Sequence, residues 1–349
     1  MFLVIPDPML DDNLPAQAPP GAPRWPLLHH PASYALLAAF FAATYLGDWM
    51  PMPETQPAIR VRAIGGEREV PFPVMALQIV LLVLGSGFLV SYVVIRSRNI
   101  RVFPRCEFPI VPWDGWHLLR CALVALVLQR LLGAAVAWGR GLGDPSRALS
   151  HDAQALLLPL LASVRTAALC VFVLALVAER GRSLLPRIGL SGKASLGRAA
   201  LGVAGFVLIY PLLFLAVLAM ARFGPLFGIH PQPQEVLARS IGLSAPLFLV
   251  VALNAVVVAP LAEEIFFRGF FYATLRRYLG PLGAISLSAF AFSFVHGSAF
   301  HFLPLFLIGF LLAYLYERTG SLVASIVAHA TNNLHSLVVF YLTFQCGAL

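Results

Sequence analysis

The sequence has few charged residues. Only 11% of its 349 residues are Asp, Glu, Lys or Arg, against about 25% in soluble globular domains. Hydrophobic residues make up 59% of the chain, and the mean hydropathy is +0.83. This apolar excess excludes an ordinary soluble fold. Because apolar stretches long enough to cross a ~30 Å hydrocarbon core recur from end to end, the sequence predicts an all-α, polytopic transmembrane helical bundle.

Cysteine and internal repeats are scarce too. The four cysteines include no CxxC pair, so neither a disulfide framework nor a thiolate metal site is indicated. No sequence repeat is found, which argues against the paired halves common in transporters. There is no HExxH motif, the helical zinc signature of many metalloproteases.

The apolar stretches predict about nine spanning helices, within a range of eight to ten. The predicted spans are 33–48, 73–95, 117–138, 153–178, 199–220, 242–262, 282–300, 302–316 and 321–343. Residues 1–31, rich in Pro and Asp, are expected to form a flexible N-terminal tail. Residues 32–240 are assigned to N-terminal transmembrane helices.

Basic residues predict the orientation of these spans. With a cytoplasmic N-terminus, roughly twice as many Arg and Lys fall in inner segments as in outer ones, as the positive-inside rule expects. The net charge of +8 follows from this bias and suits a bilayer with anionic headgroups, so no nucleic-acid partner is predicted. The 23 arginines and single lysine indicate a GC-rich bacterial genome, and hence a protein of the bacterial inner (cytoplasmic) membrane.

Two adjacent acidic residues, Glu263 and Glu264, stand in the apolar run VVVAPLAEEIFFRGFF (residues 256–271). A carboxylate at the centre of a membrane helix costs at least ~2.5 kcal/mol, so it indicates a functional site. Glu264 and Arg268 are four residues apart on one helix face and can form a structural ion pair. That pair leaves Glu263 unexplained. Pro260 removes a backbone hydrogen bond and predicts a kink just before the glutamates.

Two histidines also lie in apolar spans, His296 in FSFVHGS and His329 in VAHATNN. At 1.5 Å per helical residue, Glu263 lies about 20 Å from Arg276, His296 about 20 Å from Gly283, and His329 about 14 Å from Gly320, all counted from the cytoplasmic side. Asn333 follows His329 by four residues and shares its helix face. The sequence therefore predicts that a carboxylate, two imidazoles and an amide meet inside the bundle as a hydrolytic site.

These residues carry a resemblance to a known family. EEIFFRG matches EExxxR, FSFVH matches FxxxH, and HATNN matches HxxxN. Their order and spacing resemble the CPBP (ABI) family of intramembrane proteases, which is related to the type II CAAX prenyl endopeptidases. The resemblance covers about residues 245–340. Residues 241–345 are accordingly assigned to CPBP-like protease core helices.

The resemblance implies an intramembrane endopeptidase that cleaves a membrane-associated protein or peptide. The candidate catalytic residues are Glu263, Glu264, Arg268, His296, His329 and Asn333. By resemblance, Glu263 and His296 activate water, His329 and Asn333 stabilise the oxyanion, and Arg268 holds Glu264 in a supporting position. This chemistry needs no cofactor. The nearby His301 and His335 are given no role.

Other readings remain open. Glu263, His296 and His329 form a His2Glu set, a ligand count that suits zinc with one open position, although Asn333 fits metal-free chemistry better. A transporter also uses membrane carboxylates and histidines as a proton relay, but strings them along a path, whereas here they cluster in one half of the chain. A bacteriocin-immunity protein or scaffold could keep the fold without catalysis.

Overall fold

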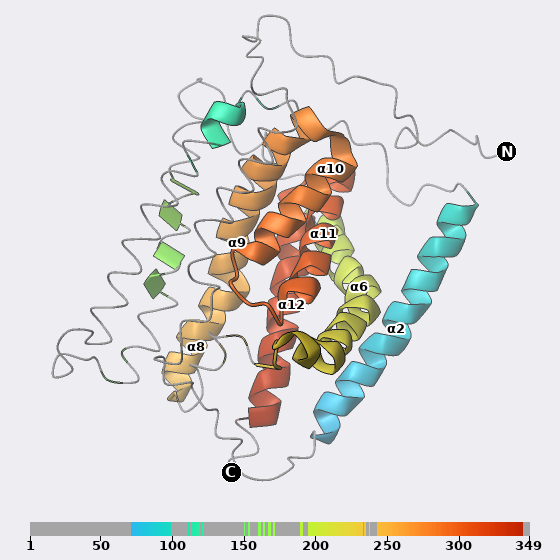
Figure 1. The fold of residues 1–349 in the computed structure, drawn as a ribbon, viewed down its shortest axis with the longest axis vertical. Coiled ribbons are helices and arrows are strands. Elements are labelled where there is room, and N and C mark those ends of the chain that lie inside the picture. The colour runs from blue at the N-terminus through green and yellow to red at the C-terminus, as the bar shows by residue number, and fades with distance from the viewer. Residues whose placement is uncertain are drawn as a thin grey trace, which may run out of the picture.

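The computed structural model describes residues 71–98, 195–232 and 243–344. It also describes residues 111, 113–118, 121, 189–190, 234 and 237, and single residues or pairs from 150 to 171. In this part of the chain every regular element is a helix (Figure 1), so the all-α prediction is confirmed. The predicted tail at 1–31, the span at 33–48 and most of the spans at 117–138 and 153–178 lie outside the described residues.

Five of the described helical stretches are long and apolar enough to cross a membrane. They contain α2 (Phe72–Ser97), α6 (Ser195–Phe223, continued by the short 3-10 helix η4, Gly224–Phe227), the run from Ala245 to Phe294, α11 (Phe302–Thr319) and α12 (Leu322–Phe344). The chain is thus an integral membrane protein. The total of nine spans remains a prediction, because much of the N-terminal half is not described.

The run from Ala245 to Phe294 is one long helical rod followed by a bend. It comprises α8 (Ala245–Leu253), η5 (Asn254–Val258), α9 (Ala259–Glu264), η6 (Ile265–Tyr272) and α10 (Ala273–Phe294). At Gly280 the backbone turns through φ 69° and ψ 178°, a conformation that glycine adopts readily. The helix therefore continues well past the predicted span end at 262. Arg268, expected in an inner segment, lies inside the rod.

Beyond this bend, α10 and α11 form a short hairpin. The arm of α10 after Pro281 has 14 residues, from 281 to 294, and is therefore about 21 Å long. In Figure 1 the outer parts of α8 and α12 extend beyond the hairpin's connecting loop. The span predicted at 282–300 is wrong at its end, because α10 stops at Phe294 and His296 lies two residues later, in the turn.

The backbone stays helical through Pro260. Both Val258 and Ala259 have helical backbone angles, and the kink expected there stays a prediction. The helix widens into π-helix on both sides of the glutamate pair, over η5 before it and η6 after it. A π turn accommodates the backbone without breaking the rod, and such segments are frequent at functional sites. Around Pro260, which has no N–H to donate, the hydrogen-bond register thus changes from α-helix to π-helix.

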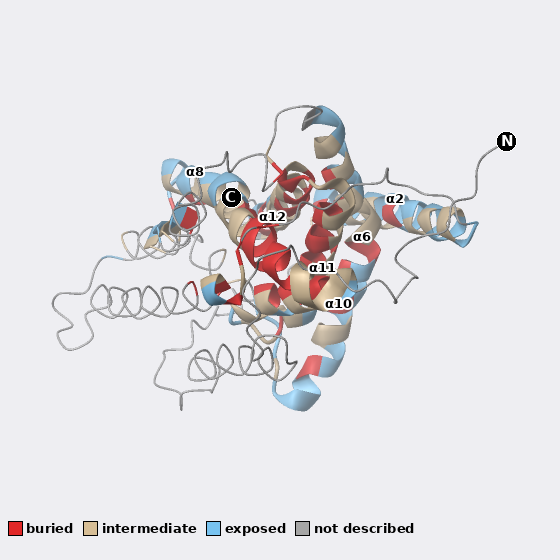
Figure 2. Ribbon diagram, turned by 90° about the horizontal axis from the view of Figure 1, so that it is seen from above, coloured by how far each residue is buried: buried red, intermediate tan, exposed pale blue. Residues whose placement is uncertain are grey.

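The core of the bundle lies between α6, α10, α11 and α12. Viewed from above, buried residues concentrate on α6, α11 and α12, while much of α2 and α8 at the periphery is exposed (Figure 2). Small residues permit this packing, as is usual between membrane helices. A Cβ atom placed on Gly202 of α6 would lie 2.5 Å from the carbonyl oxygen of Ala324 in α12. Helix α12, which carries His329, is therefore held tightly against α6.

Candidate active site

An ion pair with no exposed surface forms the base of the site. Arg268 Nη1 lies 2.7 Å from Glu264 Oε1, and both side chains are fully buried. The pair connects α9 to η6 across one helical turn. A buried carboxylate is tolerated when it is paired and hydrogen-bonded, so Arg268 accounts for the presence of Glu264 in the membrane.

Arg268 also connects the rod to the α10–α11 hairpin. Its Nη2 atom donates to the carbonyl oxygen of Gly309 in α11 at 3.0 Å. Its guanidinium carbon lies 4.6 Å from the centre of the Phe292 ring in α10, a distance at which a cation interacts favourably with an aromatic face. One side chain therefore fixes three elements relative to each other.

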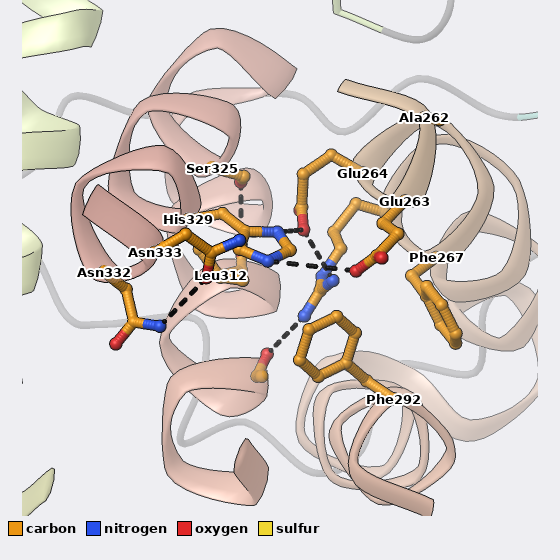
Figure 3. Close-up of polar contacts among 12 residues, drawn as sticks. Ala262, Glu263, Glu264, Phe267, Phe292, Leu312, Ser325, His329, Asn332 and Asn333 are labelled. Carbon is orange, nitrogen blue, oxygen red and sulfur yellow. Dashed lines mark hydrogen bonds and ion pairs between the residues drawn. The ribbon is translucent and has the colours of Figure 1, made fainter. Parts of the chain in front are cut away.

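His329 of α12 faces both glutamates across the bundle (Figure 3). Its Nδ1 atom is 3.1 Å from Glu264 Oε1 and its Nε2 atom is 3.8 Å from Glu263 Oε2. Because an ionised carboxylate only accepts hydrogen bonds, the contact with Glu264 places a hydrogen on Nδ1. The imidazole is buried, with 3% of its residue surface exposed, and its orientation is determined by the glutamate behind it.

Glu263 occupies the more exposed side of the cluster. Its Oε2 atom faces the Nε2 atoms of both histidines, 3.8 Å from His329 and 4.0 Å from His296. These distances are too long for direct hydrogen bonds, and Oε2 has no hydrogen-bond partner among the described residues. The side chains of Glu263 and His296 are 21% and 30% exposed, although the Oε2 atom itself is buried. These two side chains are thus more exposed than those of Glu264, Arg268 and His329.

The ring of His296 is oriented by the helix that precedes it. Its Nδ1 atom lies 2.6 Å from the carbonyl oxygen of Phe292, four residues earlier. A carbonyl oxygen can only accept, so Nδ1 carries the hydrogen and Nε2 of the neutral ring is an acceptor. Two acceptor atoms, Nε2 of His296 and Oε2 of Glu263, therefore face each other across 4.0 Å.

Asn333 lies one turn beyond His329 on α12 (Figure 3). Its Nδ2 atom donates to the carbonyl oxygen of Ala255 in η5 at 2.9 Å, and its Oδ1 atom accepts from Asn332 Nδ2 at 3.3 Å. These two contacts are consistent only with Nδ2 facing Ala255 and Oδ1 facing Asn332, so they assign the orientation of the Asn333 side-chain amide. One of the two Nδ2 hydrogens is engaged by Ala255.

The six candidate residues do not enclose a metal. Among the described residues, no group of three or more His, Cys, Asp or Glu side chains is arranged to hold one. Ligand atoms around tetrahedral zinc are about 3.3 Å apart when the bonds are about 2.0 Å long, whereas the imidazole nitrogens are 3.8 and 4.0 Å from Glu263. The observed geometry therefore does not fit the zinc alternative.

The remaining membrane histidines have different surroundings. His335 packs against Phe206 and Tyr210, with ring centres 5.7 and 5.0 Å away. The Nδ1 atom of His301 lies 2.9 Å from the hydroxyl of Ser298 in the α10–α11 loop.

The segment that contains the site is similar to a known protein family. Residues 245–335, roughly a quarter of the chain, match the family described as type II CAAX prenyl endopeptidase Rce1-like. The chain is related to the CAAX endopeptidases. All six candidate residues fall inside the matched segment, and the relation expected from the three motifs is confirmed. No curated protein and no solved structure matches the chain.

Within the matched segment, two contributors were not identified from the sequence. Phe292 is the first residue of the FxxxH motif, and it serves the site through its carbonyl on His296 and its ring on Arg268. The four-residue spacing of Phe292 and His296 in this motif could have indicated the contact, because residues i and i+4 are neighbours on a helix. Gly309 contributes only a backbone oxygen, and nothing in its sequence context identifies it.

Proposed function

We propose that the protein is an intramembrane endopeptidase in which Glu263 and His296 activate a water molecule. The observation that carries this proposal is the placement of Glu263 Oε2, which faces the Nε2 atoms of His296 and His329 at 4.0 and 3.8 Å. The Oε2 atom is buried and has no hydrogen-bond partner among the described residues, while the side chains of Glu263 and His296 are partly exposed. The relation to CAAX endopeptidases supports peptide hydrolysis as the reaction.

The proposed base step follows from the two acceptors. A water oxygen can lie at about 2.8 Å from both Oε2 of Glu263 and Nε2 of His296, because these atoms are only 4.0 Å apart. Water has two hydrogens to donate, one to each acceptor. Transfer of one proton generates hydroxide, which attacks the carbonyl carbon of the scissile bond. The same pair then returns the proton to the departing amine.

The proposed oxyanion stabilisers are His329 and Asn333. Since Nδ1 of His329 is directed at Glu264, its Nε2 can donate to an oxyanion only when the ring is an imidazolium. Glu264 stabilises that charge, and Arg268 holds Glu264 in place. Asn333 contributes its second Nδ2 hydrogen. A single positioned donor of this kind is worth about 3 kcal/mol in the transition state.

The proposed substrate is a protein or peptide associated with the membrane, because the cluster lies on helices long enough to span it. The sequence bias toward arginine supports a bacterial inner membrane as its location. There, membrane-anchored peptides or leader sequences are at least as suitable as a prenylated CAAX protein, since bacteria generally lack protein prenylation.

The test compares membranes containing the wild-type protein or the Glu263→Gln variant. Quantitative proteomics of chain termini should show a membrane-associated species that accumulates uncleaved only with the variant. Adding purified wild-type protein to the variant membranes should then produce the missing terminus. If no species accumulates and purified protein cleaves nothing in those membranes, the proposed function is wrong.

A further inference from the structure

Helix α9 begins at a point where one backbone carbonyl has lost both of its normal partners. The N–H of Ala259 would bond Ala255 in α-helix, but it bonds the carbonyl oxygen of Asn254 instead, as π-helix requires. In the π register the next donor to Ala255 would be residue 260. That residue is proline, which has no N–H. The carbonyl of Ala255 therefore receives no hydrogen bond from either helical register.

Asn333 supplies the missing donor. Its Nδ2 atom reaches across from α12 and donates to Ala255 oxygen at 2.9 Å. Side chains and neighbouring helices commonly satisfy backbone groups that proline leaves unpaired in membrane helices. Here the carbonyl belongs to the helix that carries Glu263, and the donor belongs to the helix that carries His329. The contact thus ties the two halves of the proposed site together.

The contact also orients the amide. Rotation of the Asn333 side chain by 180° would place Oδ1 against the oxygen of Ala255, where two acceptors repel. Asn332 reinforces this orientation by donating to Oδ1 at 3.3 Å. The side chain is therefore held with its donor end toward η5.

We infer that Pro260 is a positioning residue for Asn333, because it keeps the carbonyl of Ala255 available as an anchor for the amide. This inference rests on the proposed function, in which the second Nδ2 hydrogen of Asn333 serves the oxyanion. Pro260 itself does not touch the reacting atoms. It acts by withholding a backbone donor that would otherwise compete with Asn333.

The decisive variant is Pro260→Ala, which restores an N–H at this position. The new donor competes for Ala255 or returns the segment to the α register, and in either case Asn333 loses its anchor. We expect kcat to fall about 10- to 100-fold, as for other misplaced groups, with little change in KM. In an Asn333→Ala background the same change should have no further effect on kcat. Pro211→Ala, which removes a helix-interior proline from α6, is the matched control and should leave kcat unchanged.

A measurement independent of catalysis separates this inference from the proposed function. The chain has five asparagines, Asn13, Asn99, Asn254, Asn332 and Asn333, so the side-chain amide signals of full-length protein labelled with ¹⁵N-asparagine in detergent are few. Loss of one signal in Asn333→Ala assigns it. Pro260→Ala should shift or broaden that signal, and Pro211→Ala should not.

Each outcome decides the matter. An unmoved Asn333 signal in Pro260→Ala overturns the anchor, and so does an equal loss of kcat in the presence and absence of Asn333. A moved signal with wild-type kcat overturns the catalytic role of the anchor. If even the wild-type protein cleaves nothing, the proposed function fails, while a moved signal still supports the coupling of Pro260 to Asn333.

Discussion

The Nδ1 atom of His329 lies 3.1 Å from Oε1 of Glu264, a carboxylate with no exposed surface. The same oxygen accepts a hydrogen bond from Arg268 Nη1 at 2.7 Å. Because one oxygen serves both partners, a change at Arg268 reaches the imidazole through Glu264. The stability of the bundle and the orientation of the proposed site therefore depend on a single carboxylate.

Removing Arg268 should destabilise the protein strongly. Arg268→Ala leaves Glu264 buried without its cation, a change that typically costs about 3–5 kcal/mol. Thermal unfolding in detergent measures the loss. The double variant Glu264→Ala/Arg268→Ala should be less destabilised than the sum of the single variants, because the two residues act as a unit. Arg222→Ala, at the end of α6, should change stability by less than about 0.5 kcal/mol. Additive losses would contradict the pairing.

Neutralising Glu263 should abolish cleavage without unfolding the protein. Glu263→Gln keeps the shape of the side chain, and Oε2 has no hydrogen-bond partner among the described residues that the change would remove. The matched control is Glu317→Gln. Glu317 accepts hydrogen bonds from Tyr272 at 2.6 Å and from Arg276 at 3.1 Å, so this change should lower the unfolding temperature but spare kcat. The opposite pattern in the two variants would rule out Glu263 as the base.

Replacing the proposed oxyanion donors should slow turnover without weakening substrate binding. We expect Asn333→Ala and His329→Ala each to lower kcat by roughly 100- to 1000-fold with KM little changed. Thr331→Ala is the control on the same helix, because its hydroxyl donates to the backbone carbonyl oxygen of Val327 within α12. Steady-state kinetics on the cleaved substrate provide the measurement. A rise in KM with unchanged kcat would instead indicate a role in substrate binding.

Gly309 should not tolerate a methyl group. A Cβ atom there would lie 3.1 Å from a ring carbon of Phe292 and 3.2 Å from Cα of Ala289, so the α10–α11 hairpin would have to open. We expect Gly309→Ala to destabilise the protein by about 1–3 kcal/mol. Gly87→Ala in α2, where nothing lies within 4 Å of the added Cβ, should be neutral or slightly stabilising. Equal unfolding temperatures for the two variants would contradict the close packing.

Chelators should leave the activity intact. The 3.8 and 4.0 Å separations around Glu263 do not suit a zinc ion, so cleavage by purified protein should survive prolonged treatment with EDTA or 1,10-phenanthroline. Elemental analysis of the treated protein verifies that metal is absent during the assay. Activity that is lost on chelation and restored by zinc alone would establish the metal-dependent alternative.

Much of this arrangement was predictable because charge is so unusual in an apolar chain. The apolar run around them identified Glu263, Glu264 and Arg268. A comparison of depths along the predicted helices identified His296 and His329. The span ends were less predictable. Hydropathy falls at the glutamate pair, which predicts a helix end, but Arg268 is buried beside Glu264 and the rod continues to the bend at Gly280.

The π segments could not be read from the sequence. The sequence shows which residues are apolar. The π-helical register of η5 and η6, however, depends on which backbone carbonyl accepts a hydrogen bond from each N–H. The pairing of Asn333 with Ala255 depends on that register, and the alanine carries no side-chain signal. A sequence motif specifies side chains, so it does not reveal which backbone carbonyl oxygens act as acceptors, such as those of Phe292 and Gly309.

The short α10–α11 hairpin has a consequence for biogenesis. Its arm from Pro281 onward is about 21 Å long, which is shorter than a ~30 Å hydrocarbon core. Its connecting loop is thus expected at membrane depth, where lipid cannot satisfy non-helical backbone. We therefore expect the hairpin to settle only after α6, α12 and the rod have assembled around it. His296 would then reach Glu263 in one of the last steps of maturation, so that a newly inserted chain stays inert until its bundle is complete.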